Sequence, residues 1–252
     1  MTELRIPARF NGPSGSGNGG YVAGLVAYHC GAVARSHASS GPDATASPAA
    51  APVRVTLRAP APLDVPLVLR TGGLYDGDTV IAEAAPGGFE RAVPDAVSFD
   101  DADAASAAYR NDSEMFRYCF VCGTARQDGL GLAPGAVRAG MVAAPWVPGD
   151  SLPIDATLLW AAMDCPGGWA LPEMLQRPAL LGSMTANVFA LPEVGEKCVV
   201  VGADQGEQGR KSFASTAVYG TGGRRGGGGA RKWIPRKPAG LPPPPPPGRG
   251  AG

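Results

Sequence analysis

Hydrophobic and polar residues follow two patterns along the chain. One longer stretch in each half predicts a helix: residues 21–34 (YVAGLVAYHCGAVA), apolar nearly all round, and residues 155–164 (DATLLWAAMD). Asp155 stands at the position expected for the N-cap of the second helix. Shorter runs rich in β-branched residues predict strands, over residues 4–10, 53–59, 65–70, 79–84, 136–147, 180–190, 197–203 and 211–219.

The two halves repeat one order of elements, a helix followed by antiparallel strands. Residues 55–70 and 184–201 each combine a strand, a Pro-centred corner, an acidic residue and a second strand. One sheet wrapped around one helix leaves an open sheet edge, so two such units must pair to complete a core. We expect an α+β chain with units at residues 1–99 and 109–219, joined by an acidic linker at 100–108.

Glycine and proline mark the segments that we expect to lie outside this core. Residues 35–52 have almost no large apolar side chain and predict a flexible loop within the first unit. Residues 220–252 contain 11 Gly and eight Pro. This composition predicts a disordered tail in which a last strand is degraded, ending in a polyproline II segment.

Composition narrows the classes of function. The 252 residues include 44% hydrophobic ones, with Lys+Arg and Asp+Glu at 22 each, so overall charge gives no reason to expect nucleic acid. Seven of the basic residues lie in 220–252, which leaves RNA or an aromatic groove as an alternative partner of the tail. We expect no membrane span and no signal peptide, and the five cysteines suit a reducing cytoplasm.

A family resemblance rests on three stretches. Residues 10–21 (FNGPSGSGNGGY), the helix after them and residues 53–70 resemble the hotdog-fold acyl-CoA thioesterases, in particular the double-hotdog type II enzymes. Residues 158–170 (LLWAAMDCPGGWA) are similar to the central helix of that fold. The resemblance covers residues 4–219 and implies a double hotdog, two repeats of an antiparallel sheet around a central helix. It also implies thioester hydrolysis, or binding of an acyl group beside the helix.

The family's site residues are divided between the halves. Single-hotdog members show an Asn, then His-Gly-Gly, then an acid seven positions later. The first half keeps Asn11 and the Gly19–Gly20 loop, with Asn18 in place of His, but has Ala27 in place of the acid. The second half keeps the acid as Asp164 and lacks the glycines. The resemblance therefore implies one composite site, built from both units.

Each of these residues suits a step of thioester hydrolysis. Amides where a glycine turn meets a helix N-terminus can stabilise an oxyanion, which suits Gly19, Gly20 and the neighbouring Asn11. Asp164 would act as general base or nucleophile, with Asn18 positioning water or the thioester. Type II members also use a strand hydroxyl, for which Ser183 or Thr185 is the candidate, and a Gln that this chain lacks after Gln208.

The cysteine pair Cys119-Phe-Val-Cys122 could belong to a zinc site or a redox site, but the sequence lacks the other features that either site needs. A zinc site needs further ligands, and a redox pair needs a thioredoxin-like βαβ unit. We therefore expect a tight turn with buried thiols and no metal. Cys165 has no histidine near it in the sequence to activate it as a nucleophile.

The function expected is that of a cytoplasmic acyl-CoA thioesterase with no bound cofactor, coenzyme A being part of the substrate. The missing Gln and His keep a non-catalytic acyl-CoA- or lipid-binding hotdog protein as the alternative. Open sheet edges make a homo-oligomer a further expectation. Plain turn chemistry for Asn18 and helix capping by Asp164 are the simpler interpretations of those residues.

Overall fold

The structure, a computed structural model, describes residues 1–38, 51–70, 72–89, 91–172, 174 and 176–235. The predicted loop 35–52 lies mostly outside these residues, as does the polyproline segment. The first half contains one long helix and five strands: β1 (Thr2–Leu4), α1 (Gly19–Ala38), β2 (Val53–Leu57), β3 (Leu67–Arg70), β4 (Gly73–Asp76) and β5 (Thr79–Pro86). The rest follows as α2 (Phe99–Ser106), β6 (Gly135–Arg138), β7 (Met141–Trp146), α3 (Ala156–Ala162), α4 (Asp164–Trp169), β8 (Ala179–Val188), β9 (Cys198–Gln208), β10 (Lys211–Tyr219) and β11 (Arg225–Pro235).

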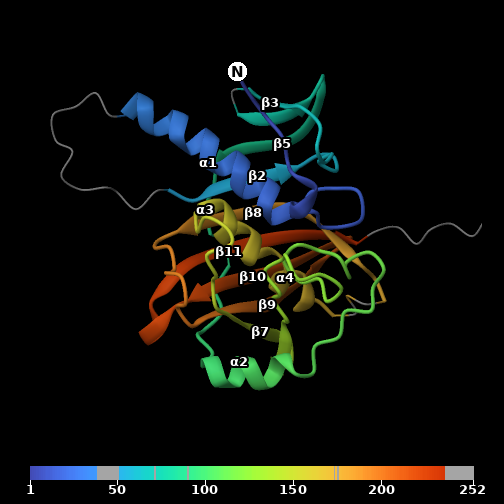
Figure 1. The fold of residues 1–252 in the computed structure, drawn as a ribbon, viewed down its shortest axis with the longest axis vertical. Coiled ribbons are helices and arrows are strands. Elements are labelled where there is room, and N and C mark those ends of the chain that lie inside the picture. The colour runs from blue at the N-terminus through green and yellow to red at the C-terminus, as the bar shows by residue number, and fades with distance from the viewer. Residues whose placement is uncertain (39–50, 71, 90, 173, 175, 236–252) are drawn as a thin grey trace, which may run out of the picture.

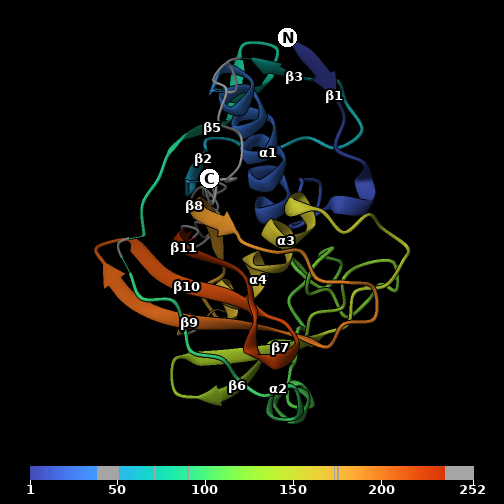
Figure 2. The same ribbon diagram turned by 90° about the vertical axis from the view of Figure 1, so that its left-hand side faces the viewer.

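The strands form one antiparallel sheet of 11 strands, in the order β1-β3-β4-β5-β2-β8-β11-β10-β9-β7-β6. The strands of the first half occupy one side of this order and those of the second half the other. β2 and β8 join the two sides, with Val53 opposite Ala186 and Thr56 opposite Ser183. The α+β class is therefore confirmed, with the sheet curving past the helices (Figures 1 and 2).

Helices α1 and α3 pack against each other at the junction of the two halves (Figure 1). Two glycines of α1 permit the close approach. A Cβ on Gly20 would lie 2.5 Å from the Asp164 Cβ, and a Cβ on Gly24 would lie 2.6 Å from the Trp160 Cβ. Since real Cβ atoms are not found so close to other atoms, larger residues at these positions would push the helices apart.

Residues 100–108, expected to be a plain linker, lie largely within helix α2. Ser98 caps this helix by accepting a hydrogen bond from the Asp101 amide at 3.1 Å. Its buried Ala102 packs with Met141 and Val199. Side chains alternate between the two faces of a strand, so Ala144 and Val200 point to the opposite face from Met141 and Val199. Ala144 and Val200 belong to the core beneath α3 and α4, and α2 therefore covers the outer face of the sheet.

The prediction that residues from 220 onward are disordered and carry a degraded last strand is wrong for β11. This strand pairs with β8 on one edge and β10 on the other, in the interior of the sheet. Glycine weakens a strand mainly through entropy, and pairing along both edges offsets that cost. The faces are also filled, since Gly227 lies against Met163 and Gly228 against Val93.

Smaller differences follow from local turns. The strand expected over residues 136–147 is two strands, because Gly140 turns the chain with a φ of 68°. The strand expected over 4–10 is reduced to β1 and a 3-10 turn at Ala8–Phe10, and β4 was not predicted. Helix α1 continues to Ala38, into the predicted loop.

Candidate active site

A pocket of about 520 Å³ opens where the two halves meet. The first half contributes the glycine loop 12–19 and residues 57–61, which begin at the last residue of β2. The second half contributes the 116–122 segment, residues along α4 and the first residues of β8. The polar and nucleophilic side chains that line the pocket include those of Asn18, Asp164, Cys119, Cys122 and Cys165. A mostly apolar pocket with a few convergent polar groups is the usual form of a small-molecule site.

Asp164 lies at the break between α3 and α4 and is only 3% exposed. The break has a covalent cause. Pro166 has no N–H to donate to the carbonyl of Ala162, so the helical ladder cannot continue through it. Proline is tolerated in the first turn of a new helix, and the chain restarts as α4 at Asp164. This places the Asp164 carboxylate against the N-terminus of α1.

Asn18 binds Asp164 and caps α1 at the same time. Its Oδ1 accepts a hydrogen bond from the Tyr21 amide at 2.9 Å, as an N-cap residue does. Its Nδ2 donates to Asp164 Oδ2 at 3.1 Å and lies 3.8 Å from the sulfur of Cys119. Asn18 is 2% exposed, so these contacts fix the orientation of the amide.

The two glycines play different parts. The Gly20 amide donates to Asp164 Oδ2 at 2.8 Å, so it binds the carboxylate itself. Gly19 lines the pocket and is the first residue of α1. The first amides of a helix lack partners within the helix, and the helix dipole is positive at this end. Gly19 is therefore the better placed of the two for an oxyanion.

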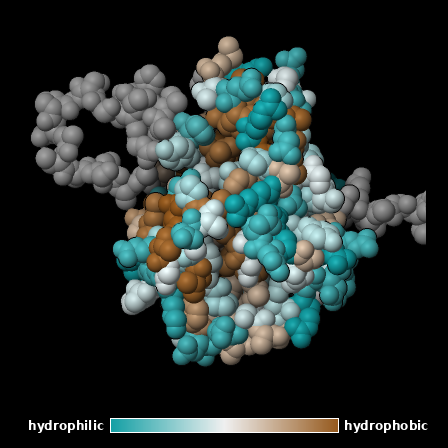
Figure 3. All heavy atoms as spheres, in the orientation of Figure 1, coloured by the Kyte–Doolittle hydropathy of each residue, from teal (hydrophilic) through white to brown (hydrophobic). Residues whose placement is uncertain are grey.

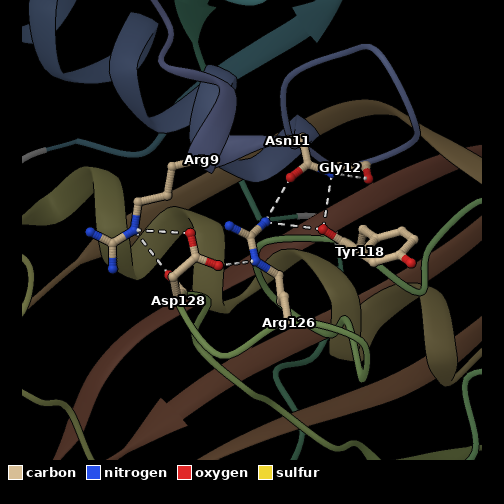
Figure 4. Close-up of polar contacts among 6 residues, drawn as sticks. All are labelled: Arg9, Asn11, Gly12, Tyr118, Arg126 and Asp128. Atoms are coloured by element: carbon tan, nitrogen blue, oxygen red, sulfur yellow. Dashed lines mark hydrogen bonds and ion pairs between the residues drawn. The ribbon is translucent and has the colours of Figure 1, made fainter.

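Asn11 is not among the described residues that line this pocket; it holds two loops together (Figure 4). Its Nδ2 donates to the carbonyl of Tyr118 at 3.0 Å, and its Oδ1 accepts from Arg126 Nη1 at 2.6 Å. Arg126 also donates to Asp128 at 2.8 Å, and this contact holds the pKa of Asp128 below its usual value. These contacts tie the glycine loop of the first half to the segment that carries the cysteine pair.

Aromatic packing strengthens the same junction. The ring of Tyr21 stacks on Phe10 with centroids 4.0 Å apart, and Phe120 meets Phe10 edge-on at 4.9 Å. Burial, with a smaller contribution from the charge of Asp155, raises the pKa of Tyr21 to about 12. The hydroxyl therefore stays protonated at neutral pH.

The structure does not bring Ser183 or Thr185 to the pocket. Leu181 and Met184 both belong to the core, although they are three positions apart, because a bulge at Gly182 interrupts the alternation of β8. The neighbours of Met184 consequently face the other side of the sheet. Among the described residues, the part of β8 that lines the pocket ends at Gly182.

Three cysteines form a cluster that the sequence did not indicate. Cys119, Cys122 and Cys165 are buried, with their sulfur atoms all within 4.8 Å of one another. Hydrogen bonds with the Cys122 and Cys165 thiols hold the pKa of Cys119 well below its usual value, while hydrogen bonds with Cys119 and Cys122 raise the pKa of Cys165. The cysteine pair alone was visible in the sequence. Its third member lies 43 residues beyond Cys122, directly after Asp164.

Comparisons of the whole structure define the fold as a hotdog fold. A protein of Novosphingobium aromaticivorans, provisionally assigned as a thioesterase, superposes with a TM-score of 0.63 at 13% identity, over 93% of this chain and 95% of that one. A hotdog-fold protein of unknown function from Alicyclobacillus acidocaldarius gives 0.57 at 13% identity, over 94% and 93%. The tesB protein of Mycobacterium avium subs paratuberculosis gives 0.54 at 12% identity, over 93% and 91%.

The sequence itself matches no protein-family model and no curated protein. The likeness is therefore one of structure, and it shows the fold.

Over the part of the chain that the structure describes, no helix is long and apolar enough to cross a membrane. Figure 3 shows brown, hydrophobic areas among polar ones on one face, and the exposed large apolar residues include Val147, Phe189, Leu191 and Val194.

Proposed function

We propose that the protein hydrolyses acyl-CoA thioesters at one composite site between two hotdog repeats. One observation carries the proposal. Asp164, from the second half, is buried on the wall of the pocket and accepts hydrogen bonds from Gly20 and Asn18 of the first half. A carboxylate held rigidly beside a helix N-terminus and an apolar pocket suits acyl transfer to water. The provisional thioesterase assignment of the Novosphingobium aromaticivorans protein agrees with this chemistry.

The proposed reaction needs few groups. A water molecule attacks the thioester carbonyl carbon while Asp164 takes up a proton from it. The developing oxyanion lies at the Gly19 amide, where the dipole of α1 stabilises negative charge. The carbon–sulfur bond then breaks, and the coenzyme A thiolate takes the proton that Asp164 accepted from water, so coenzyme A leaves as the thiol and Asp164 is a carboxylate again. Asn18 holds the carboxylate in place and does not need to react.

Asp164→Asn tests this function, because it keeps the size of the side chain and removes the base. We expect kcat/KM for a panel of acyl-CoA substrates to fall about 1,000-fold, the range found for a positioned general base. Asp150→Asn is the matched control, since Asp150 is exposed. Equal activity in Asp164→Asn and the control would refute the assigned role of Asp164.

A binding protein without turnover is the second candidate, and a specific observation favours it. The amides of Gly20 and Asn18 are already engaged by Asp164, and the candidate hydroxyls of Ser183 and Thr185 lie on the other face of the sheet. Titration calorimetry with acyl-CoA and with its non-hydrolysable thioether separates the two candidates. Tight binding of both, with no release of free thiol, would support the binding protein.

A further inference from the structure

The cluster of Cys119, Cys122 and Cys165 takes no part in the proposed hydrolysis, although it shares a wall of the same pocket. The three side chains are 1%, 2% and 8% exposed. They come from two segments, a turn at 119–123 and the first turn of α4. The fold therefore brings together three soft ligands that the sequence keeps apart.

The turn that carries Cys119 and Cys122 is tightly closed by its own backbone. The Gly123 amide donates to the Cys119 carbonyl at 2.8 Å, and a Cβ on Gly123 would lie 2.5 Å from that carbonyl oxygen. Only glycine fits this closed turn without displacing it.

Other side chains hold the second cysteine. Tyr109 donates its hydroxyl to the Cys122 carbonyl at 2.9 Å, and Asn111 Nδ2 donates to the same oxygen at 3.0 Å. Such outer contacts are what orient the ligands of a metal centre. They leave the sulfur of Cys122 facing those of the other two cysteines.

The spacing of the sulfur atoms fits a metal ion. Zinc–sulfur bonds of about 2.3 Å in a tetrahedron place sulfur atoms about 3.8 Å apart. The sulfur atoms of Cys119 and Cys165 lie 3.7 Å apart, and all three pairs lie within 4.8 Å. Soft thiolate ligands in this geometry select zinc over hard cations such as magnesium.

We propose that Cys119, Cys122 and Cys165 bind one zinc ion. Three thiolates leave the fourth tetrahedral position to a water molecule or to a ligand from the pocket, since all three cysteines line it. The Asn18 amide, 3.8 Å from the Cys119 sulfur, would offset part of the thiolate charge. This inference goes beyond the proposed hydrolysis and does not depend on it.

Metal content of the full chain, purified under reducing conditions, tests the proposal. We expect about one zinc per chain by elemental analysis after chelator-washed gel filtration. Cobalt added to metal-free protein should give the thiolate charge-transfer and visible bands of a tetrahedral site. Cys165→Ser should reduce bound zinc to a few per cent of the wild-type content. Cys198→Ser, a buried cysteine outside the cluster, should retain it.

Three results would overturn the proposal. They are a wild-type chain that takes up neither zinc nor cobalt, a Cys165→Ser variant that retains full zinc, and a mass that shows a disulfide between two of the three cysteines in the reduced preparation. If Cys165→Ser fails to fold, as judged by circular dichroism, the wild-type cobalt spectrum decides alone. No substrate is used, so failure here leaves the proposed hydrolysis standing.

Discussion

The two halves of the molecule carry helices of different construction. In the first half, α1 is one continuous helix of 20 residues that follows a glycine-rich loop. The second half contains two short helices that pack near it, α3 with seven residues and α4 with six. At the pocket, α1 presents backbone amides at its start, and α4 presents a carboxylate at its first residue.

This difference explains why the candidate site lies between the halves. Gly20 has no side chain, so α1 can approach the break closely enough for its amide to reach Asp164. Pro166 creates the break and thereby turns the carboxylate toward α1. In the proposed site, the first half supplies the amides and the second half supplies the carboxylate. The predictions below test this division of labour.

Gly20→Ala should give the largest effect, because it acts on the contact between the halves. The new Cβ would lie 2.5 Å from the Asp164 Cβ and 2.6 Å from the Trp160 carbonyl oxygen, so backbone must move. We expect the free energy of unfolding to fall by about 3 kcal/mol, as in other overpacked cores. Urea denaturation followed by circular dichroism measures this change.

Gly149→Ala is the control for that substitution, since nothing lies within 4 Å of a Cβ built there. Its free energy of unfolding should stay within about 0.5 kcal/mol of wild type. A Gly20→Ala variant as stable as Gly149→Ala would show that the helices do not meet as closely as described.

The resemblance to hotdog thioesterases pointed to Gly19, Gly20 and Asp164, and the structure brings these residues together where the two halves meet. The facing of β8 could not be read in this way. A bulge at Gly182 reverses the alternation, so Ser183 and Thr185 face away from the pocket. Bulges depend on the partner strand, which no local pattern specifies.

Long-range contacts account for the other failures. The cysteine pair gave no hint of Cys165, because only the docking of the 119–123 turn against α4 brings the third thiol near. Strand β11 was likewise hidden by its glycines. Its stability comes from hydrogen bonds to β8 and β10 along both edges. The amino-acid composition of the strand does not show which strands will pair with it.

Substitutions of Asn18 separate its two roles, as the cap of α1 and as the hydrogen-bond donor to Asp164. Asn18→Ala loses the cap of α1 and the hydrogen bond to Asp164, so we expect a loss of about 2 kcal/mol in stability. Asn18→Ser can still cap the helix and should recover about 1 kcal/mol of this. Neither variant can reach Asp164, so thioester hydrolysis should fall about 100-fold in both.

Thermal unfolding and kcat/KM measured on both variants separate the two contributions. A serine variant that regains activity along with stability would show that Asn18 acts only as a helix cap. In that case the hydrogen bond from the Gly20 amide would be enough to hold Asp164 in place.

Glu196→Gln should give the smallest effect, because it acts on the second half away from the junction. Glu196 accepts hydrogen bonds from the amides of Glu193 and Thr221, both at 3.0 Å, and from Arg224 at 2.9 Å. The hydrogen bond from the Glu193 amide, followed by those from Thr221 and Arg224, lowers the pKa of Glu196 below its usual value. These contacts hold the turn that leads into β11, so their weakening should cost about 1 kcal/mol at neutral pH.

The pH dependence of that cost follows from the direction of the shift. A carboxylate whose pKa is lower in the folded state stabilises the fold above its unfolded pKa of about 4.3, and this contribution disappears as the pH falls through the folded value. Denaturation of wild type and Glu196→Gln should therefore differ at pH 7. The difference should begin to shrink as the pH falls below about 4.3 and should vanish only below the lowered folded pKa, where the carboxyl is protonated in both states. Glu193→Gln removes the same charge from an exposed side chain. Its free energy of unfolding should therefore stay close to that of wild type at pH 7 and at low pH. A difference that persists unchanged at low pH would mean that packing, and not the charge of Glu196, holds the glycine strand in the sheet.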